Sequence, residues 1–140
     1  MGKILCATRG GEGSYQTQDG AIDLARERGD ELIFFYVADA SFLDRMAAPM
    51  VVDVELRLEN MGHFELARAR QRARTQGIEA QAIVRRGRLR PQIVAAVREM
   101  GVTLIVLGRP GERAAVFEDE TLPAFAAAIQ AETGVEVRIV

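Results

Sequence analysis

This 140-residue sequence predicts a doubly wound α/β domain, and three observations carry the prediction. Short apolar runs alternate along the whole chain with longer stretches of helical periodicity. The short runs are rich in β-branched or aromatic residues, and most have glycine nearby. Two of them, Glu31–Val37 and Thr103–Leu107, are nearly continuous in apolar character, as strands are when helices cover both faces. The order β-α-β-α-β-α-β-α-β therefore predicts a parallel five-stranded sheet with helices on both faces.

Each strand is predicted by its own apolar run between turn-forming residues. The five expected strands are Ile4–Ala7, Glu31–Val37, Ile78–Val84, Thr103–Leu107 and Val135–Val140. In a sheet of this kind ligands bind beyond the carboxyl ends of the strands, where the winding reverses. We therefore look for function in the loops that follow the strands.

Four helices are expected between these strands. The first should be capped by Ser14 and end at Gly29, because serine favours the N-cap and glycine the position after the last turn. The second should begin at Val54 and end before Gly77. The third should carry Pro91 in its first turn and end at Gly101, and the fourth should end near Gly134. The fourth presents one apolar stripe at i, i+3, i+4 and i+7, formed by Leu122, Phe125, Ala126 and Ile129.

The composition is that of one globular domain, residues 1–140, with 49% hydrophobic and 27% charged residues. A net charge of −2 argues against a nucleic-acid or membrane-surface partner. The single cysteine, Cys6, rules out an internal disulfide, and no Cys/His spacing suggests a metal site. No signal-peptide core or membrane-length apolar run is present, so we expect a cytoplasmic protein.

The segment Asp39–Val52 is irregular in pattern and contains Met46, Pro49 and Met50. We expect a connector without regular structure, and a flap over the strand ends is the alternative.

The loop Thr8–Ser14 follows the first strand and contains three glycines. Glycines let the backbone approach a ligand closely, and the helix that follows offers free N–H groups to an anion. A tight turn between strand and helix explains the same residues without a ligand.

The loop Arg85–Pro91 places four arginines before a helix N-terminus, where positive charge is unfavourable unless something negative meets it. A ligand phosphate, an acidic partner or carboxylates of the same chain could meet it. We favour pairing within the chain or with solvent.

A third loop, Gly108–Arg113, follows the most strand-like run, and its two glycines permit close passage of a nucleotide. Here the whole chain resembles a universal stress protein domain in length and in element order. The segment Leu104–Gly111 resembles the family's "D-L-I-V-M-G-S-R-G". Val84, Gly87 and Ile93 resemble its "V-x2-G … I", and Tyr36-Val37 its "H-V".

The resemblance implies a sheet of order 3-2-1-4-5 and a homodimer formed through the last strand, Val135–Val140. It also implies a site for ATP or AMP, because members that bind ATP carry G-x2-G-x9-G-(S/T) after the fourth strand. The residues that would form this site are Thr8, Arg9, Gly10, Val37, Gly108, Arg109, Gly111, Arg113 and Thr121.

The chain departs from the ATP motif at specific positions. Gly108 and Gly111 match, but Thr121 replaces the third glycine and Leu122 the hydroxyl residue. Arg9 stands where the family has the aspartate of "P-V-D-G-S". The run Glu118–Thr121 also places three carboxylates where the phosphates would lie, and each close pair of like charges costs on the order of 4 kcal/mol before screening.

Two functions follow as alternatives. One is a small dimeric regulatory module of the stress response that binds ATP or AMP weakly. The other is a dimeric protein-interaction module that binds no nucleotide, its site closed by arginine–carboxylate pairs.

We expect no enzyme, or at most very weak ATP hydrolysis, because no nucleophile lies in a recognisable pattern with a base. His63, the one histidine, is expected to be a surface or packing residue, and Cys6 a small buried hydrophobe. No catalytic and no metal-binding residues are therefore assigned.

Overall fold

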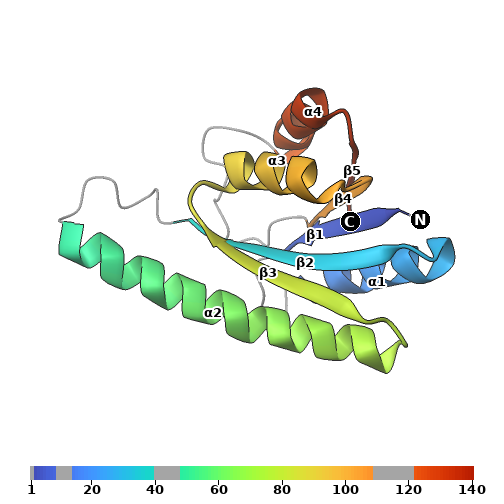
Figure 1. The fold of residues 1–140 in the computed structure, drawn as a ribbon, viewed down its shortest axis with the longest axis horizontal. Helices are drawn as coiled ribbons and strands as arrows, with labels where there is room; N and C mark the ends of the chain where they lie inside the picture. The colour runs from blue at the N-terminus through green and yellow to red at the C-terminus, as the bar shows by residue number, and fades with distance from the viewer. Residues whose placement is uncertain (1, 9–13, 40–47, 109–121) are drawn as a thin grey trace.

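The computed structural model describes residues 2–8, 14–39, 48–108 and 122–140, and of residues 48–53 only the backbone. Five strands and four helices alternate along the chain, as the sequence predicts (Figure 1). The strands are β1 (Lys3–Ala7), β2 (Glu31–Ala38), β3 (Ala80–Arg86), β4 (Leu104–Leu107) and β5 (Glu136–Ile139). The helices are α1 (Tyr15–Arg28), α2 (Ala48–Thr75), α3 (Leu89–Met100) and α4 (Leu122–Thr133).

All five strands are parallel and form one sheet of order β3-β2-β1-β4-β5. This confirms both the parallel sheet and the order that the family resemblance implies. The central strand β1 pairs with β2 on one side and with β4 on the other, so that Ala7 lies between Phe35 and Leu107. The carboxyl ends of β1 and β4 are therefore neighbours at one edge of the sheet.

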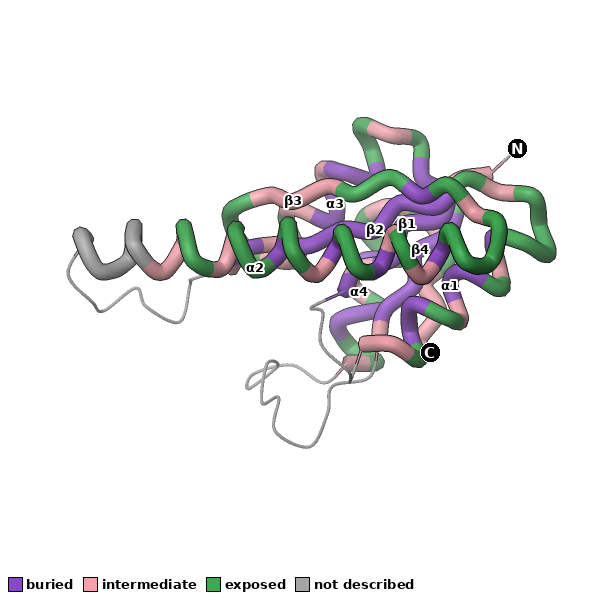
Figure 2. Tube along the Cα trace, turned by 90° about the horizontal axis from the view of Figure 1, so that it is seen from below, coloured by how far each residue is buried: buried purple, intermediate pink, exposed green. Residues whose placement is uncertain are grey.

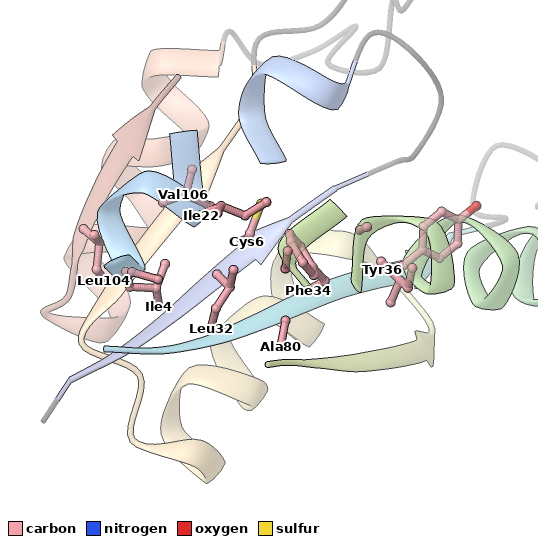
Figure 3. Close-up of a cluster of buried hydrophobic side chains, with 14 of the residues drawn as sticks. Ile4, Cys6, Ile22, Leu32, Phe34, Tyr36, Ala80, Leu104 and Val106 are labelled. Carbon is pink, nitrogen blue, oxygen red and sulfur yellow. The ribbon is translucent and has the colours of Figure 1, made fainter. Parts of the chain in front are cut away.

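Helices cover both faces of the sheet, and the period-2 alternation of the strands divides the core between them. Ile4 and Cys6 of β1 contribute to the layer under α1 and α2, whereas Leu5 contributes to the layer under α3 and α4. Figure 3 shows the first layer, in which Phe34 and Tyr36 of β2 lie with Cys6 and Ile22. The nearly continuous apolar runs of β2 and β4 are buried, as expected for strands covered on both faces.

Helix ends agree with the sequence prediction at most positions. Gly29 and Gly101 end α1 and α3 in the left-handed conformation, and Pro91 lies in the first turn of α3. Ser14 precedes α1 as expected, but its side chain makes no capping hydrogen bond and its backbone is already helical (φ −91°, ψ −10°). The helical backbone at Ser14 departs from the extended conformation that a capping side chain usually has.

Two predicted boundaries are wrong. Helix α2 begins at Ala48, so residues 48–52 are helical where we expected an irregular connector. Pro49 is compatible with this start, because the first helical turn does not need the N–H that proline lacks. Strand β3 spans Ala80–Arg86 rather than Ile78–Val84, so that Arg85 and Arg86 pair with Val37 and Ala38.

The long helix α2 extends past the sheet that it covers (Figures 1 and 2). Its 28 residues correspond to about 42 Å of helix, whereas the seven residues of β3 correspond to about 23 Å of strand. Between residues 54 and 75 its buried residues are Gly62, Leu66, Ala69 and Ala73, which all lie in its second half. No helix in the described ranges is long and apolar enough to cross a membrane.

Candidate functional site

The carboxyl ends of β1 and β4 mark the point where the chain reverses its winding. The chain leaving β1 leads to α1 on one face of the sheet, and the chain leaving β4 leads to α4 on the other. Loops that leave adjacent strands toward opposite faces leave room for a ligand between them. This switch point is where the sequence places the nucleotide site.

The structure describes three of the nine predicted site residues. Thr8 follows β1 and is buried, and its N–H donates to the carbonyl of Phe35 at 2.9 Å. Gly108 follows β4 beside it, because Ala7 and Leu107 are paired. Val37 is half-buried near the end of β2, where it pairs with Arg85 of β3.

The other six predicted site residues lie outside the described residues. They are Arg9, Gly10, Arg109, Gly111, Arg113 and Thr121. The expected carboxylates Glu118, Asp119 and Glu120 lie in the same undescribed range.

Gly108 allows α1 to pack directly against the end of β4. A Cβ atom at Gly108 would lie 2.3 Å from Oγ1 of Thr17 and 3.1 Å from its Cβ. Real Cβ atoms essentially never come that close, so a larger residue would have to move α1 or the strand. The glycine expected for nucleotide approach is thus also required by packing within the chain.

Buried polar side chains gather at this switch point. Among the described residues the buried polar side chains are Thr8, Thr17 and Gln18. Gln18 Nε2 donates to Oγ1 of Thr8 at 3.2 Å, and Oγ1 of Thr17 donates to the carbonyl of Val140 at 3.5 Å. The other buried side chains of the described core are apolar. The three buried polar side chains all lie next to the ends of β1, β4 and β5.

Gln18 has one further polar atom without a partner. Its Oε1 is buried, and no donor among the described residues reaches it. A buried acceptor left without a donor costs about 1–3 kcal/mol. The side chain of Gln18 is therefore a polar feature of this site that the apolar core alone does not explain.

Sequence analysis missed Thr17 and Gln18, although a signal for them exists. Thr17 lies four residues before Ala21 and eight before Ala25, so it belongs to the buried stripe of α1. Gln18 precedes Ile22 by four residues and belongs to the same stripe. Polar residues inside an otherwise apolar helix stripe indicate a buried polar site.

Three of the four arginines in the segment Arg85–Pro91 pair with carboxylates of the same chain, as we favoured. Arg85 pairs with Glu99 at 2.6 Å, and Arg86 pairs with Glu59. Arg90 pairs with Glu132 of α4. The hydrogen bond from Arg85, and then its charge, lower the pKa of the Glu99 carboxyl.

The N-terminus of α3 also has a negative group of its own. The N–H of Leu89 donates to Oδ2 of Asp39 at 3.0 Å. A carboxylate at this position satisfies a free N–H and complements the helix dipole. One N–H of this helix start is therefore already bound by a carboxylate of the same chain.

Neither Cys6 nor His63 takes part in the switch point: Cys6 is separated from it by its chemistry, and His63 by its position. Cys6 is completely buried, and burial raises the pKa of its thiol to about 12, so it stays protonated at neutral pH. His63 is exposed on α2, 4.0 Å from Glu59. Within the described ranges no group of three or more His, Cys, Asp or Glu side chains could hold a metal ion.

Comparison with known proteins gives consistent matches. The model of the Universal stress protein family matches residues 1–117. Universal stress protein YxiE of Bacillus subtilis (strain 168) is 30% identical over 117 residues, which cover 78% of this chain and 79% of that protein.

Solved structures match over the whole chain at lower identity. Universal stress protein UspA from Lactobacillus plantarum is 16% identical with a TM-score of 0.79, over 99% of this chain and 97% of that one. A universal stress protein family protein from Arabidopsis thaliana with AMP bound is 14% identical with a TM-score of 0.64, over 100% and 91% of the two chains. At these identities the likeness shows the fold.

Proposed function

Because this chain belongs to the universal stress protein family, we propose that it is a small regulatory domain of the stress response that binds an adenine nucleotide weakly. The observation that carries the proposal is the switch point itself. Thr8 and Gly108 lie side by side at the ends of β1 and β4, where the chain reverses its winding. A relative of the same fold is a complex with AMP.

The loops that leave β1 and β4 also support a nucleotide site. The glycine-rich segment 9–13 leaves β1, and the segment that contains Gly111 leaves β4. Both segments begin at the switch point, which is where ligands bind in open α/β sheets. Val37, at the end of the next strand, would lie near the base.

The affinity should be low because of charge. The chain has Glu118, Asp119 and Glu120 directly before α4, in the segment where a triphosphate would meet a helix N-terminus. Each close like-charge pair costs on the order of 4 kcal/mol at an effective dielectric of about 20. Arg9, Arg109 and Arg113 would offset part of this repulsion. AMP, with fewer phosphate charges, should therefore be tolerated better than ATP.

A first test is the identity of any ligand that accompanies the protein. Mass spectrometry of small molecules released from freshly purified protein should detect AMP, ADP or ATP at a low fraction of the protein concentration. Stoichiometric ATP would contradict the proposed repulsion.

A second test measures that repulsion directly. In calorimetry, the triple variant Glu118→Gln, Asp119→Asn, Glu120→Gln should bind ATP more tightly than the wild-type protein. The matched control neutralises three exposed acids elsewhere, Asp23, Glu27 and Glu79, and should leave the affinity unchanged. Unchanged or weaker binding by the first variant would refute the charge argument. If neither protein binds AMP or ATP, the domain is instead an interaction module whose site is closed by its own ion pairs.

The assembly we propose is a homodimer formed through β5. This strand is at the edge of the sheet, and an edge strand presents N–H and C=O groups that a second copy could pair with. The N–H of Val137 points away from β4 and donates to Oε1 of Gln130 at 3.4 Å. Glu136 and Arg138 of this edge strand form an ion pair at 3.0 Å.

The dimer is tested by placing a proline on the outer edge of β5. Val137→Pro loses the hydrogen bond to Gln130 but should keep the fold, because proline is tolerated on an edge strand, and its ring should block pairing with a second strand. In sedimentation equilibrium the wild-type protein should have twice the mass of the chain and the variant the mass of one chain. Wild-type protein that sediments as a single chain would overturn the proposal.

A further inference from the structure

The first turn of α1 presents two buried polar side chains, Thr17 and Gln18, to the ends of the strands. Oγ1 of Thr17 lies against the ends of β4 and β5, because it donates to the carbonyl of Val140 and is the atom nearest to a Cβ at Gly108. Gln18 lies against the end of β1, where its Nε2 donates to Oγ1 of Thr8 at 3.2 Å. The helix therefore borders the switch point with polar atoms.

The Gln18 amide lies on the α1 side of the sheet. Ile4 and Cys6 of β1 belong to the core layer under α1 and α2, and alternate residues of a strand share a face. Thr8 continues that alternation directly after the strand, and its hydrogen bond with Gln18 agrees with it. The amide is thus inside this layer at the point where the chain leaves β1.

The Gln18 amide has an acceptor that the fold does not use. Gln18 is 1% exposed, and no donor among the described residues reaches its Oε1. Such groups are uncommon in folded proteins, and each one calls for an explanation such as a functional role or a bound molecule. Packing alone does not require a glutamine here, because the other residues of the stripe beyond Gln18, Ala21, Ile22 and Ala25, are apolar.

An amide oxygen selects its partner by chemistry. It accepts hydrogen bonds and carries no net charge, so it binds an O–H or N–H group. The oxygens of an ionised phosphate are acceptors themselves and would be repelled by it. In an adenine nucleotide the neutral donors are the ribose hydroxyls and the amino group of the base. The natural partner of Oε1 is therefore on the nucleoside part of the ligand and not on its phosphate.

We infer that Gln18 is a specificity-determining residue of the nucleotide site, with Oε1 accepting a hydrogen bond from a ribose hydroxyl or from the amino group of the base. This inference rests on the proposed nucleotide binding. Thr8, which Gln18 contacts, lies beside Gly108 at the switch point. A ligand without the donor would leave Oε1 unpaired, and sites built to bind a hydroxyl or amino group reject such analogues strongly.

An internal water molecule is the other occupant that would satisfy Oε1. A buried water needs about two to four polar partners, and the hydroxyls of Thr8 and Thr17 are the other buried polar side-chain groups in the described core. Such a water would belong to the fold with or without a nucleotide. Replacing Gln18 would then leave the affinity for the nucleotide unchanged.

The test compares three ligands in NMR titrations of the full-length protein. They are AMP, 2′,3′-dideoxy-AMP, which lacks both ribose hydroxyls, and purine riboside 5′-monophosphate, which lacks the amino group. The wild-type protein should bind AMP about tenfold or more tightly than one of the analogues, which corresponds to about 1.4 kcal/mol. The analogue that binds more weakly identifies the donor.

Gln18→Leu should bind AMP about tenfold more weakly than the wild-type protein and should no longer distinguish AMP from that analogue. The effects of the two changes are then not additive, as expected when both remove the same hydrogen bond. Gln71→Leu makes the same substitution at an exposed position of α2 and should change neither the Kd nor the discrimination.

Stability separates a ligand-binding role from a structural one. Gln18→Leu and Gln18→Met, which has an unbranched side chain of similar length, should both melt within about 4 °C of the wild-type protein or above it. Each removes a buried acceptor that has no donor in the free protein, and this offsets the loss of the hydrogen bond to Thr8.

Three results would overturn the inference. If both variants bind AMP as tightly as the wild-type protein does, Oε1 belongs to an internal water, and the proposed nucleotide function stands. If both variants melt many degrees lower or fail to fold, the amide serves the fold. If the wild-type protein binds no AMP up to about 10 mM, the proposed function falls together with the inference.

Discussion

At the scale of single residues, the switch point is built by unusually close packing and by polar groups. A Cβ atom at Gly108 would lie only 2.3 Å from Oγ1 of Thr17, and Gln18 reaches Thr8 beneath the end of β1. These contacts join α1 to the ends of β1 and β4. They stabilise the strand ends from which both candidate nucleotide-binding loops leave.

Gly108→Ala should destabilise the protein by about 1–3 kcal/mol, the usual cost of forcing an extra group into a packed region. Adding Thr17→Ala removes the nearest atom, Oγ1 at 2.3 Å, and should recover part of that loss. Urea unfolding of the two single variants and the double variant measures this coupling. Strictly additive effects would show that the two residues do not compete for the same space.

Cys6 should make the protein sensitive to alkaline pH. Burial raises the pKa of its thiol from 9.0 to about 12, so above pH 9 the unfolded chain releases a proton that the folded protein keeps. The contribution of Cys6 to stability is thus complete below pH 9 and declines between pH 9 and pH 12, by up to about 1.4 kcal/mol per pH unit.

The measurement compares the wild-type protein with Cys6→Ala in urea unfolding at pH 7, 9 and 10.5. The difference in unfolding free energy between them should change above pH 9 in favour of the variant. Parallel pH curves for the two proteins would mean that the thiol ionises equally in both states.

At the scale of elements, α2 is two half-helices with different roles. Its second half packs on β2 and β3, with Leu66, Ala69 and Ala73 buried. Its first half extends past the sheet (Figure 1). Gly62 lies at the junction, where a Cβ would come within 2.4 Å of the Tyr36 ring.

Gly62→Ala should therefore destabilise the protein, although alanine favours helix by about 1 kcal/mol over glycine. The cost of overpacking against a buried ring, about 1–3 kcal/mol, should exceed that gain. Ala67→Gly, at an exposed position one turn further along α2, calibrates the propensity term and should cost up to about 1 kcal/mol. A more stable Gly62→Ala protein in thermal unfolding would mean that α2 can move away from β2.

At the scale of the whole molecule, weak nucleotide binding should have a small effect on thermal stability. A ligand stabilises the folded state by RT ln(1 + [L]/Kd), which is about 0.4 kcal/mol when its concentration equals Kd. For a chain of this size that corresponds to roughly 1–2 °C. Millimolar ATP should therefore raise the melting temperature only slightly, and a rise of many degrees would contradict weak binding.

The amino-acid sequence alone determined the alternation of elements, because period 2 and period 3.6 are local properties that each segment carries. It also indicated the family, through residues such as Leu104–Gly111. The ends of the helices and strands were predicted less accurately. Pro49 is typical of a loop but lies in the first turn of α2, and Arg85 and Arg86 are typical of a loop but belong to β3.

Only the tertiary structure decided which distant groups meet. Arg85 and Arg86 of β3 and Arg90 of α3 pair with Glu99, Glu59 and Glu132, which come from three different helices. The burial of Gln18, the approach of Gly62 to Tyr36 and the exposure of Phe64 likewise depend on how α1 and α2 sit on the sheet. Local pattern cannot supply these facts, because contact across a sheet or between helices is set by the packing of the whole chain rather than by any one segment.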